Sequence, residues 1–163
     1  MANDTTMRTL LRNLPVLSGP FPAFQLTPTA SPATPQETFK TWLSDSITAN
    51  IKEPHAMTVS TVDSSGYPDA RVLILKDVDS RGWHFAVKAT SPKGRQLATN
   101  PSVALTFYWA EMGRQVRIRG KARVLSEEEC RADFEARPVE SRVSAVASQQ
   151  SEILRSREEL VEK

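Results

Sequence analysis

Two short basic stretches contain the residues of this sequence that are best suited to hold an anion. In the first, Arg71 and Lys76 bracket four consecutive apolar residues. In the second, Lys93 and Gly94 follow Ser91-Pro92, a pair typical of the start of a helix. Arginine binds phosphate as a two-pronged donor, lysine binds it as a point charge, and a helix N-terminus adds partial positive charge. Solvent-exposed charge explains each stretch alone, but the two together favour a phosphate site.

The sequence gives little evidence for a metal site, a cysteine-based site or a nucleophilic serine. The two histidines, His55 and His84, have no carboxylate near them at the spacing of metal ligands, so we predict no metal site. The single cysteine, Cys130, excludes an internal disulfide and a site built from several cysteines. No Gly-x-Ser-x-Gly motif marks a nucleophilic serine. The residues therefore indicate anion binding but no catalytic group.

Length and charge limit the class of protein. A chain of 163 residues can bury one sizeable core but not two. Its 21 basic residues nearly balance its 19 acidic ones, and the charges are mixed along the chain, which argues against a nucleic-acid partner. No apolar run approaches the roughly 20 residues that span a bilayer, and the N-terminus lacks the apolar part of a secretory signal. We expect a cytoplasmic protein that acts on a small molecule and contacts no membrane.

The chain divides into a proline-rich tail and one folded domain. Six of the eleven prolines lie at or before position 35, and residues 27–35 are nearly all threonine, proline, alanine and serine. Such a composition buries too little apolar surface to offset the entropy lost on ordering. We predict a tail at 1–34 and a domain at 35–163, with the more apolar residues 20–24 docked on the domain or on a partner subunit.

A helix is predicted directly after the tail. Thr34 is suited to cap it, Pro35 suits its first position, and Glu37 completes a capping box. The helix should end by Asn50. Four apolar residues recur in it at helical spacing and predict a stripe that packs into the core: Phe39, Trp42, Leu43 and Ile47.

Apolar residues between turn signals predict five strands. These strands span residues 56–62, 71–76, 83–88, 103–109 and 115–124, with a turn at 63–66 after the first. The apolar run of the second strand indicates burial on both faces, whereas alternation in the fifth indicates a half-buried strand with a cationic outer face. Short helices are predicted at 93–98, after the capping box of Ser126 and Glu129, at 141–147 and at 151–163. This order of elements predicts a mainly β protein, a small antiparallel barrel with peripheral helices.

A series of short motifs follows in an order that resembles one protein family. The series comprises Glu53-Pro54-His55-Ala56-Met57, Gly66-x-Pro68, the run from Ala70 to Lys76, Lys93-Gly94-Arg95, Asn100-Pro101, Arg114-Gln115-Val116, Arg137-Pro138 and Gln150-Ser151. Each motif alone is weak, whereas the ordered set, over about residues 36–155, is specific. It resembles the pyridoxamine 5′-phosphate oxidase family, whose members are FMN-binding split β-barrels with short peripheral helices.

The resemblance implies a homodimer with FMN bound at the subunit interface. Arg71 and Lys93 match the positions that bind the phosphate of FMN, and the strand that begins at Arg71 matches the one that lies along the flavin. Gln150 and Ser151 are expected from the other subunit. The complete set of implied cofactor-binding residues is Arg71, Val72, Leu73, Ile74, Leu75, Lys76, Lys93, Gln115, Gln150 and Ser151.

The resemblance also implies an activity. Its members oxidise a C–N or C–O carbon of pyridoxamine or pyridoxine 5′-phosphate, with oxygen as the acceptor. Lys76, Arg137 and Ser141 match the positions that hold the phosphorylated substrate. The chain also resembles members that act in phenazine-type biosynthesis, at Phe21-Pro22 and in the strand of Trp109. We therefore expect an FMN-dependent oxidase, and the alternative is an FMN-binding split barrel whose oxidase activity is lost or altered.

Three departures from the family pattern bear on this choice. Ser91-Pro92-Lys93 stands where Ser-Arg-Lys is common, which removes one phosphate contact. Asp133 stands where a substrate-binding tyrosine is usual, and a carboxylate there would repel a phosphate. The sequence also lacks the C-terminal region in which members carry a flavin-contacting tryptophan, an Arg-Leu-His motif and a further arginine. We expect FMN binding to be retained and oxidation of pyridoxamine phosphate to be impaired.

Overall fold

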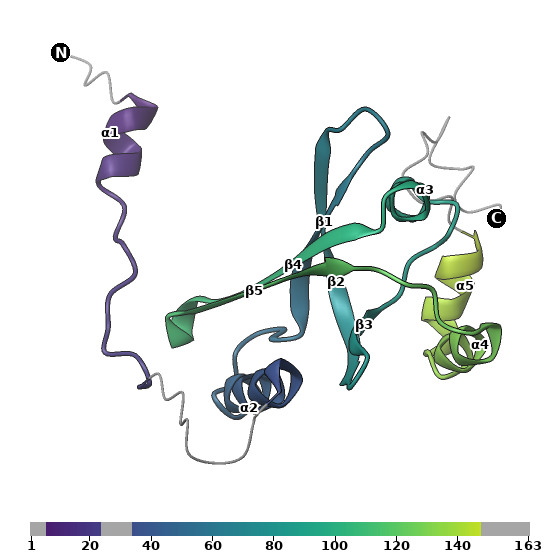
Figure 1. Cartoon of the computed structure of the whole chain (residues 1–163). Coiled ribbons are helices and arrows are strands. Elements are labelled where there is room, and N and C mark those ends of the chain that lie inside the picture. Colours follow the sequence, from purple (N-terminus) through teal and green to yellow (C-terminus); the bar gives the residue numbers. More distant parts are fainter. Residues whose placement is uncertain (1–5, 24–33, 148–163) are drawn as a thin grey trace. The chain divides into compact units, whose positions relative to one another are not determined.

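The computed structural model describes residues 6–23 and 34–147, which contain a five-stranded sheet (Figure 1). The strand order is β3-β2-β1-β4-β5, and the pairs β1–β2, β1–β4 and β2–β3 are antiparallel. The strands are β1 Ala56–Val62, β2 Pro68–Asp79, β3 Gly82–Phe85, β4 Ser102–Trp109 and β5 Arg114–Lys121. The helices are α1 Met7–Arg12, α2 Pro35–Thr48, α3 Pro92–Thr99, the short 3-10 helix η1 Ala110–Met112, α4 Glu127–Glu135 and α5 Val139–Ala147. The predicted mainly β class with peripheral helices is confirmed.

The chain forms two compact units. The first comprises the residues up to Pro54 together with Tyr108–Gln115, and the second comprises His55–Phe107 together with the residues from Val116 on. No helix within residues 6–23 and 34–147 is long and apolar enough to cross a membrane. The helix predicted at 151–163 lies outside the described residues, and the boundary predicted between a tail and a domain stays a prediction.

The β1–β2 hairpin of the second unit is set by its turn. Asp63 Oδ1 accepts hydrogen bonds from the backbone N–H groups of Ser65 and Tyr67, at 2.8 and 2.9 Å. Gly66 has φ +87°, a conformation that glycine adopts without strain. The predicted turn is therefore present, and it sets the register in which the two strands pair.

The apolar run of β2 is buried on one face only. Leu75 is 7% exposed, whereas Val72 is 66% exposed and Lys76 is also exposed. The expectation of burial on both faces is wrong, because only alternate side chains of β2 face the interior of this unit. β2 pairs with β1 along 68–74 and with β3 only from Leu75 onward. In the part of the chain that the structure describes, its second edge between Pro68 and Ile74 therefore has no strand partner.

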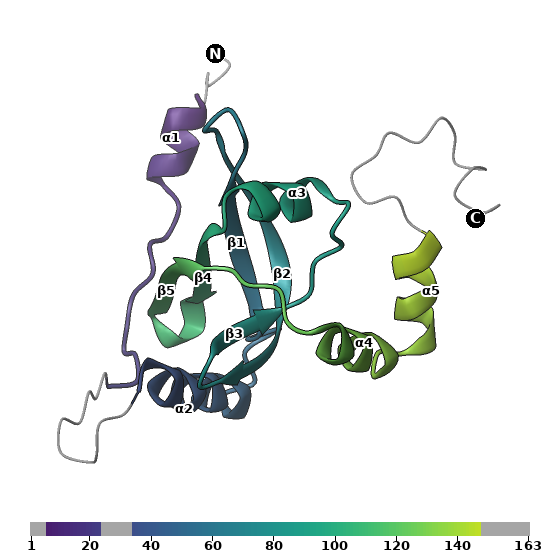
Figure 2. The ribbon, with the colours of Figure 1, turned by 45° about the vertical axis from the view of Figure 1, so that its right-hand side comes forward.

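The third strand ends at Phe85, earlier than predicted, because the chain next forms the cap of α3. Ser91 Oγ accepts a hydrogen bond from the Gly94 N–H at 3.2 Å and donates one to the Lys88 carbonyl at 2.7 Å. A Cβ atom at Gly94 would lie 2.4 Å from the carbonyl oxygens of Lys88 and Ala89, so only glycine permits this close approach. The helix so capped packs beside β1 (Figures 1 and 2).

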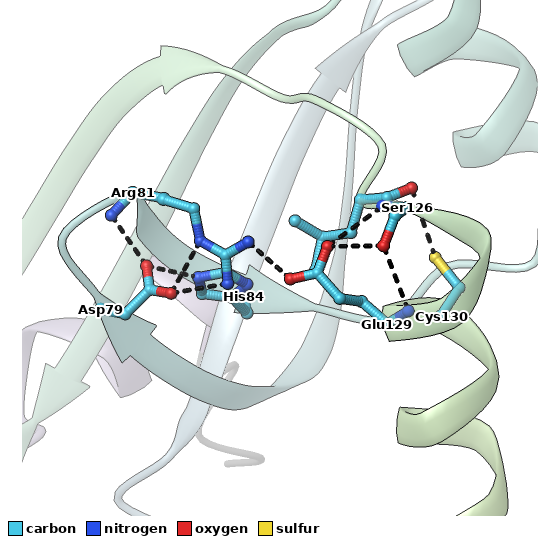
Figure 3. A network of polar contacts seen from close by, with 7 residues as sticks. Asp79, Arg81, His84, Ser126, Glu129 and Cys130 are labelled. Carbon is cyan, nitrogen blue, oxygen red and sulfur yellow. Dashed lines mark hydrogen bonds and ion pairs between the residues drawn. The ribbon is translucent and has the colours of Figure 1, made fainter.

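A charged network connects the β2–β3 turn to α4, as Figure 3 shows. Arg81 Nε donates to Asp79 Oδ2 at 2.8 Å, and Arg81 Nη1 donates to Glu129 Oε1 at 2.5 Å. His84 Nε2 lies 2.8 Å from Asp79 Oδ1. Glu129 also accepts from the Ser126 hydroxyl at 2.8 Å, within the predicted capping box of α4. Arg81 therefore links an acceptor at the turn to the first turn of the helix.

The first unit is organised around two buried aromatic rings. Phe39 of α2 is 1% exposed and Trp109 is 2% exposed, and their ring centroids lie 6.1 Å apart. The indole Nε1 of Trp109 donates to the Pro54 carbonyl at 2.8 Å, so its polar atom is satisfied while the ring is buried. The unit also holds Phe21 against Gly113, where an added Cβ would lie 2.6 Å from the ring. Phe21 thus docks on the folded part of the chain, which is one of the two alternatives expected for residues 20–24, and residue 24 lies outside the described residues.

The predicted start of α2 is confirmed, but its buried stripe differs from the prediction at one end. Thr34 and Glu37 form the capping box in both directions. Ser46 is fully buried, and its hydroxyl donates to the Trp42 carbonyl at 2.8 Å, whereas Ile47 is 59% exposed. The prediction for Ile47 is therefore wrong. The self-satisfied hydroxyl of Ser46 allows the smaller residue to face the interior.

The fifth strand is half-buried, as predicted. Arg117, Arg119 and Lys121 are exposed and alternate with more buried residues. Arg114 belongs to the buried set at 8% exposure, and its guanidinium lies 5.2 Å from the ring centroid of Trp42. This cation–π contact was not predicted, because the sequence shows no sign that the two segments meet.

Phe39→Ala should lower the free energy of unfolding by about 3–5 kcal/mol, because it removes a fully buried aromatic ring from the first unit. Ile47→Ala in the same helix should change it by less than about 0.5 kcal/mol, because Ile47 is mostly exposed. Urea unfolding at one protein concentration would measure both. Equal losses for the two variants would contradict the assignment of the buried face.

The Arg81–Glu129 contact should make stability depend on pH. Hydrogen bonds from Arg81 and Ser126 lower the pKa of Glu129 from 4.5 to about 2. A carboxyl group whose pKa is depressed by folding stabilises the protein above its unfolded pKa, and the contribution is lost as the pH falls through the folded value. Glu129→Gln should therefore lower the melting temperature at neutral pH, and the deficit should shrink as the pH falls from 4.5 toward 2.

Glu128→Gln is the matched control, since it removes an equal charge from the same helical turn without touching Arg81. Its melting temperature relative to wild type should not follow the pattern expected for Glu129→Gln. A Glu129→Gln deficit that stayed constant across this pH range would show that the ion pair is not its cause.

Candidate functional site

Arg71 lies in β2 and is held by four acceptors of the second unit. Its Nη1 donates to the Val59 carbonyl at 3.1 Å and to Thr61 Oγ1 at 2.7 Å. Its Nη2 donates to Gln96 Oε1 at 3.3 Å and forms an ion pair with Asp69 Oδ2. The hairpin register explains two of these contacts, because it sets Val59 opposite Arg71 and Thr61 opposite Asp69. The guanidinium is thereby fixed in position rather than extended into solvent.

The acceptors around Arg71 are also bonded to one another. Gln96 Nε2 donates to Asp69 Oδ2 at 3.1 Å, and the Thr61 hydroxyl donates to Gln96 Oε1 at 2.5 Å. The hydrogen bond from Gln96, together with the charge of Arg71, lowers the pKa of Asp69, so this carboxylate is ionised at neutral pH. Sequence reasoning missed these three residues. Asp69 alone had a signal, because it lies two residues before Arg71 and so on the same face of β2.

Lys93 brings a second cation to the same cluster. It is only 5% exposed, at the start of α3. Burial lowers its pKa, the positive charge of Arg71 lowers it further, and the Asp69 carboxylate opposes both effects. The structure thus brings together the two residues that the sequence singled out for phosphate. Two neighbouring cations, one of them buried, fit an anionic group with more than one negative charge.

The N-terminus of α3 contributes less than expected from the sequence. Pro92 has no N–H, and the Gly94 N–H already donates to Ser91 Oγ. The Arg95 N–H donates to the Ser91 carbonyl at 3.0 Å. The cluster therefore depends mainly on the side chains of Arg71 and Lys93 for its positive potential.

The remaining cofactor-site residues of the sequence analysis lie in several places. Val72 and Lys76 are exposed on β2, and the run from Val72 to Lys76 includes the buried Leu75. Gln115 lies on β5 in the first unit and is exposed. Gln150 and Ser151 lie outside the described residues.

Arg137, expected to contact a substrate phosphate, is paired with an acidic neighbour. Both Nε, at 3.2 Å, and Nη2 donate to Asp133 Oδ2. The guanidinium also lies 5.5 Å from the ring centroid of Phe134. The other two residues expected there, Lys76 on β2 and Ser141 on α5, are exposed. Charge at Arg137 is therefore balanced by one carboxylate, whereas Arg71 has a carboxylate and a second cation, Lys93, in its cluster.

Comparison with known proteins places these features in a family. The family model described as pyridoxamine 5′-phosphate oxidase matches residues 43–162. A protein of Thermosynechococcus vestitus, named pyridoxine/pyridoxamine 5′-phosphate oxidase, is 50% identical over 126 residues, which are 77% of this chain and 60% of that protein. A protein of the same name from Paraburkholderia phytofirmans is 46% identical over 126 residues, 77% of this chain and 59% of that one. The chain thus spans about 60% of the length of these relatives.

Two solved structures have a similar fold. PhzG from Burkholderia lata, in complex with tetrahydrophenazine-1-carboxylic acid, has 32% sequence identity and a TM-score of 0.82 over 88% of this chain and 71% of that chain. A pyridoxamine 5′-phosphate oxidase-related, FMN-binding protein from Nostoc punctiforme has 14% identity and a TM-score of 0.64 over 78% of this chain and 71% of that chain, which bears on the fold alone. The predicted split-barrel fold is confirmed, and the chain belongs to the pyridoxamine 5′-phosphate oxidase family.

Proposed function

We propose that this protein is an FMN-dependent oxidase of the pyridoxamine/pyridoxine 5′-phosphate oxidase type. The observation that carries the proposal is the cluster in which Arg71 contacts Gln96 of α3, while the buried Lys93 lies one turn before Gln96 in the same helix. A cofactor that ends in a phosphate monoester brings more than one negative charge, which fits a site that contains two cations. Membership of the pyridoxamine 5′-phosphate oxidase family supports the same cofactor class.

In this proposal, β2 binds FMN by its backbone as well as by Arg71. The edge of β2 between Pro68 and Ile74 has no strand partner in the described parts of the chain. Backbone N–H groups on such an edge are available to the polar atoms of a planar ligand. The residues proposed to lie along the flavin are Val72, Leu73, Ile74, Leu75 and Lys76, with Gln115, Gln150 and Ser151 completing the set.

In this proposal the residues of the chain bind FMN and orient the substrate. When bound, FMN would supply the redox chemistry: the substrate gives up two electrons and two protons, one from the oxidised carbon and one from its nitrogen or oxygen, and molecular oxygen accepts them to form hydrogen peroxide. Arg71 and Lys93 hold the phosphate end, and Lys76 and Ser141 are proposed to face the substrate. We further propose that the protein is a homodimer in which Gln150 and Ser151 reach the FMN of the partner subunit.

A second candidate function is favoured by the pairing of Arg137 with Asp133. A guanidinium that is already neutralised by a carboxylate attracts a phosphate dianion only weakly. The similarity to PhzG, whose structure contains a tricyclic carboxylic acid rather than a phosphate ester, points in the same direction. The second candidate is therefore an FMN-dependent oxidase whose substrate carries no phosphate.

Arg71→Ala should weaken FMN binding by about 1.5–3 kcal/mol, the size of one charge-assisted hydrogen bond. Fluorescence titration of FMN into flavin-free protein would measure the change. Arg117→Ala is the matched control, because Arg117 is an exposed arginine of β5 outside the cluster. Equal FMN affinity in wild type and Arg71→Ala would contradict the proposed phosphate site.

Peroxide release from pyridoxamine 5′-phosphate and from pyridoxamine separates the two candidates. The first candidate predicts turnover of the phosphorylated substrate by wild type, with a raised KM and unchanged FMN affinity in Arg137→Ala. The second predicts no turnover of the phosphorylated substrate by wild type. Asp133→Asn, which frees Arg137 and removes a negative charge, should in that case improve binding of pyridoxamine 5′-phosphate and leave that of pyridoxamine unchanged.

A further inference from the structure

We propose that Asp69 is the resident counter-ion of Arg71 and that a phosphate monoester displaces it from this guanidinium on binding. The inference rests on the proposed function for the identity of the ligand, the phosphate of FMN. It assigns to Asp69 a positioning role: the carboxylate holds the empty site together and at the same time limits its affinity.

A phosphate cannot contact two N–H groups of Arg71 without displacing an acceptor that is already bonded to this side chain. A guanidinium has five N–H groups, of which four are on the two terminal nitrogens. Nη1 uses its pair on Val59 O and Thr61 Oγ1, and Nη2 uses its pair on Gln96 Oε1 and Asp69 Oδ2. A phosphate that binds through two parallel N–H···O bonds must therefore take over at least one donor that the chain already occupies.

Of the four acceptors, Asp69 is the one that can leave. The Val59 carbonyl belongs to β1 and is held by the register of the hairpin. Thr61 is 1% exposed, and Gln96 is bonded to both Thr61 and Asp69. The Asp69 side chain is 46% exposed, so it can turn toward water at small cost. Its departure frees one side of Nη2 and keeps the other three contacts.

The positive charges of Arg71 and Lys93 give the carboxylate of Asp69 a role in the ligand-free protein. Without a ligand, Arg71 and the buried Lys93 repel each other, and Asp69 is the anion that offsets this repulsion. With a phosphate bound, the ligand brings about −1.5 to −2 charges of its own, and the carboxylate becomes a like charge beside it. The same residue therefore stabilises the empty protein and opposes the occupied one.

This dual role predicts effects of opposite sign from one substitution. Asp69→Asn keeps a carbonyl oxygen that can accept from Arg71 and Gln96 but removes the charge. The flavin-free variant should melt at a lower temperature than wild type, because the two cations lose their counter-ion. Its affinity for FMN should nevertheless rise, on the order of tenfold, because the phosphate no longer competes with a carboxylate. A residue that merely supported the fold would lower both quantities.

The experiment compares FMN with riboflavin, which has the same ring but no phosphate. Both are titrated by fluorescence into flavin-free wild type, Asp69→Asn and the charge-matched control Glu128→Gln. We expect Asp69→Asn to tighten FMN binding and to change riboflavin binding by less than about twofold, and Glu128→Gln to change neither. The gain for FMN should decline at high salt, as for any effect of charge at a partly exposed site.

The possible results are distinguishable. Asp69→Asn with unchanged or weaker FMN binding overturns the inference, and so does an equal gain for FMN and riboflavin. Wild-type protein that binds no FMN overturns the proposed function and the inference with it, whereas FMN binding without the Asp69 effect overturns the inference alone. Should Asp69→Asn fail to fold, Asp69→Ser removes the same charge with a smaller side chain and gives the same test.

Discussion

A guanidinium that is largely buried must have its donors satisfied, and this requirement at Arg71 determines how the second unit is arranged. The acceptors come from three elements: β1 supplies Val59 and Thr61, β2 supplies Asp69, and α3 supplies Gln96. Each must lie at hydrogen-bond distance for the charge to be tolerated away from water. The position of α3 beside β1 is therefore coupled to the position of Arg71. Because Lys93 lies at the start of α3, its position is coupled to that of Arg71 as well.

The two arginines proposed to bind anions differ in their surroundings. Arg71 has one carboxylate partner, Asp69, and one cationic neighbour, Lys93. Arg137 has the carboxylate of Asp133 and an aromatic ring, so its surroundings are close to neutral. The contrast supports a phosphate at the first position and favours a substrate without one at the second.

An arginine also connects the β2–β3 turn to α4 through hydrogen bonds to carboxylates, here at the protein surface. Arg81 joins acceptors from two segments that are far apart in the sequence, Asp79 and Glu129, and depresses the pKa of both carboxyl groups. Arg137 lies two residues after the end of α4. The network therefore contributes to where the proposed substrate residues lie, although no member of it is proposed to touch the substrate.

Features that are satisfied within a few residues could be predicted from the sequence alone. The capping boxes at Thr34 and Ser126, the turn at Asp63 and the cap at Ser91 each use donors and acceptors that lie two to four residues apart. Their local geometry does not depend on the rest of the fold. For that reason the starts of α2, α3 and α4 were predicted closely, and the order of the motifs along the chain was enough to indicate the family.

Features that depend on distant segments were decided by the tertiary structure. The exposure of Val72 and Ile47 depends on which surfaces other elements cover, and periodicity does not contain that information. The contact of Thr61 and Gln96 with Arg71 likewise joins residues 10 and 25 positions away. Amino-acid types thus predicted an anion site around Arg71 and Lys93. Packing of α3 against β1 decided that Lys93 lies near Arg71, because only folding brings these two charges close enough to interact.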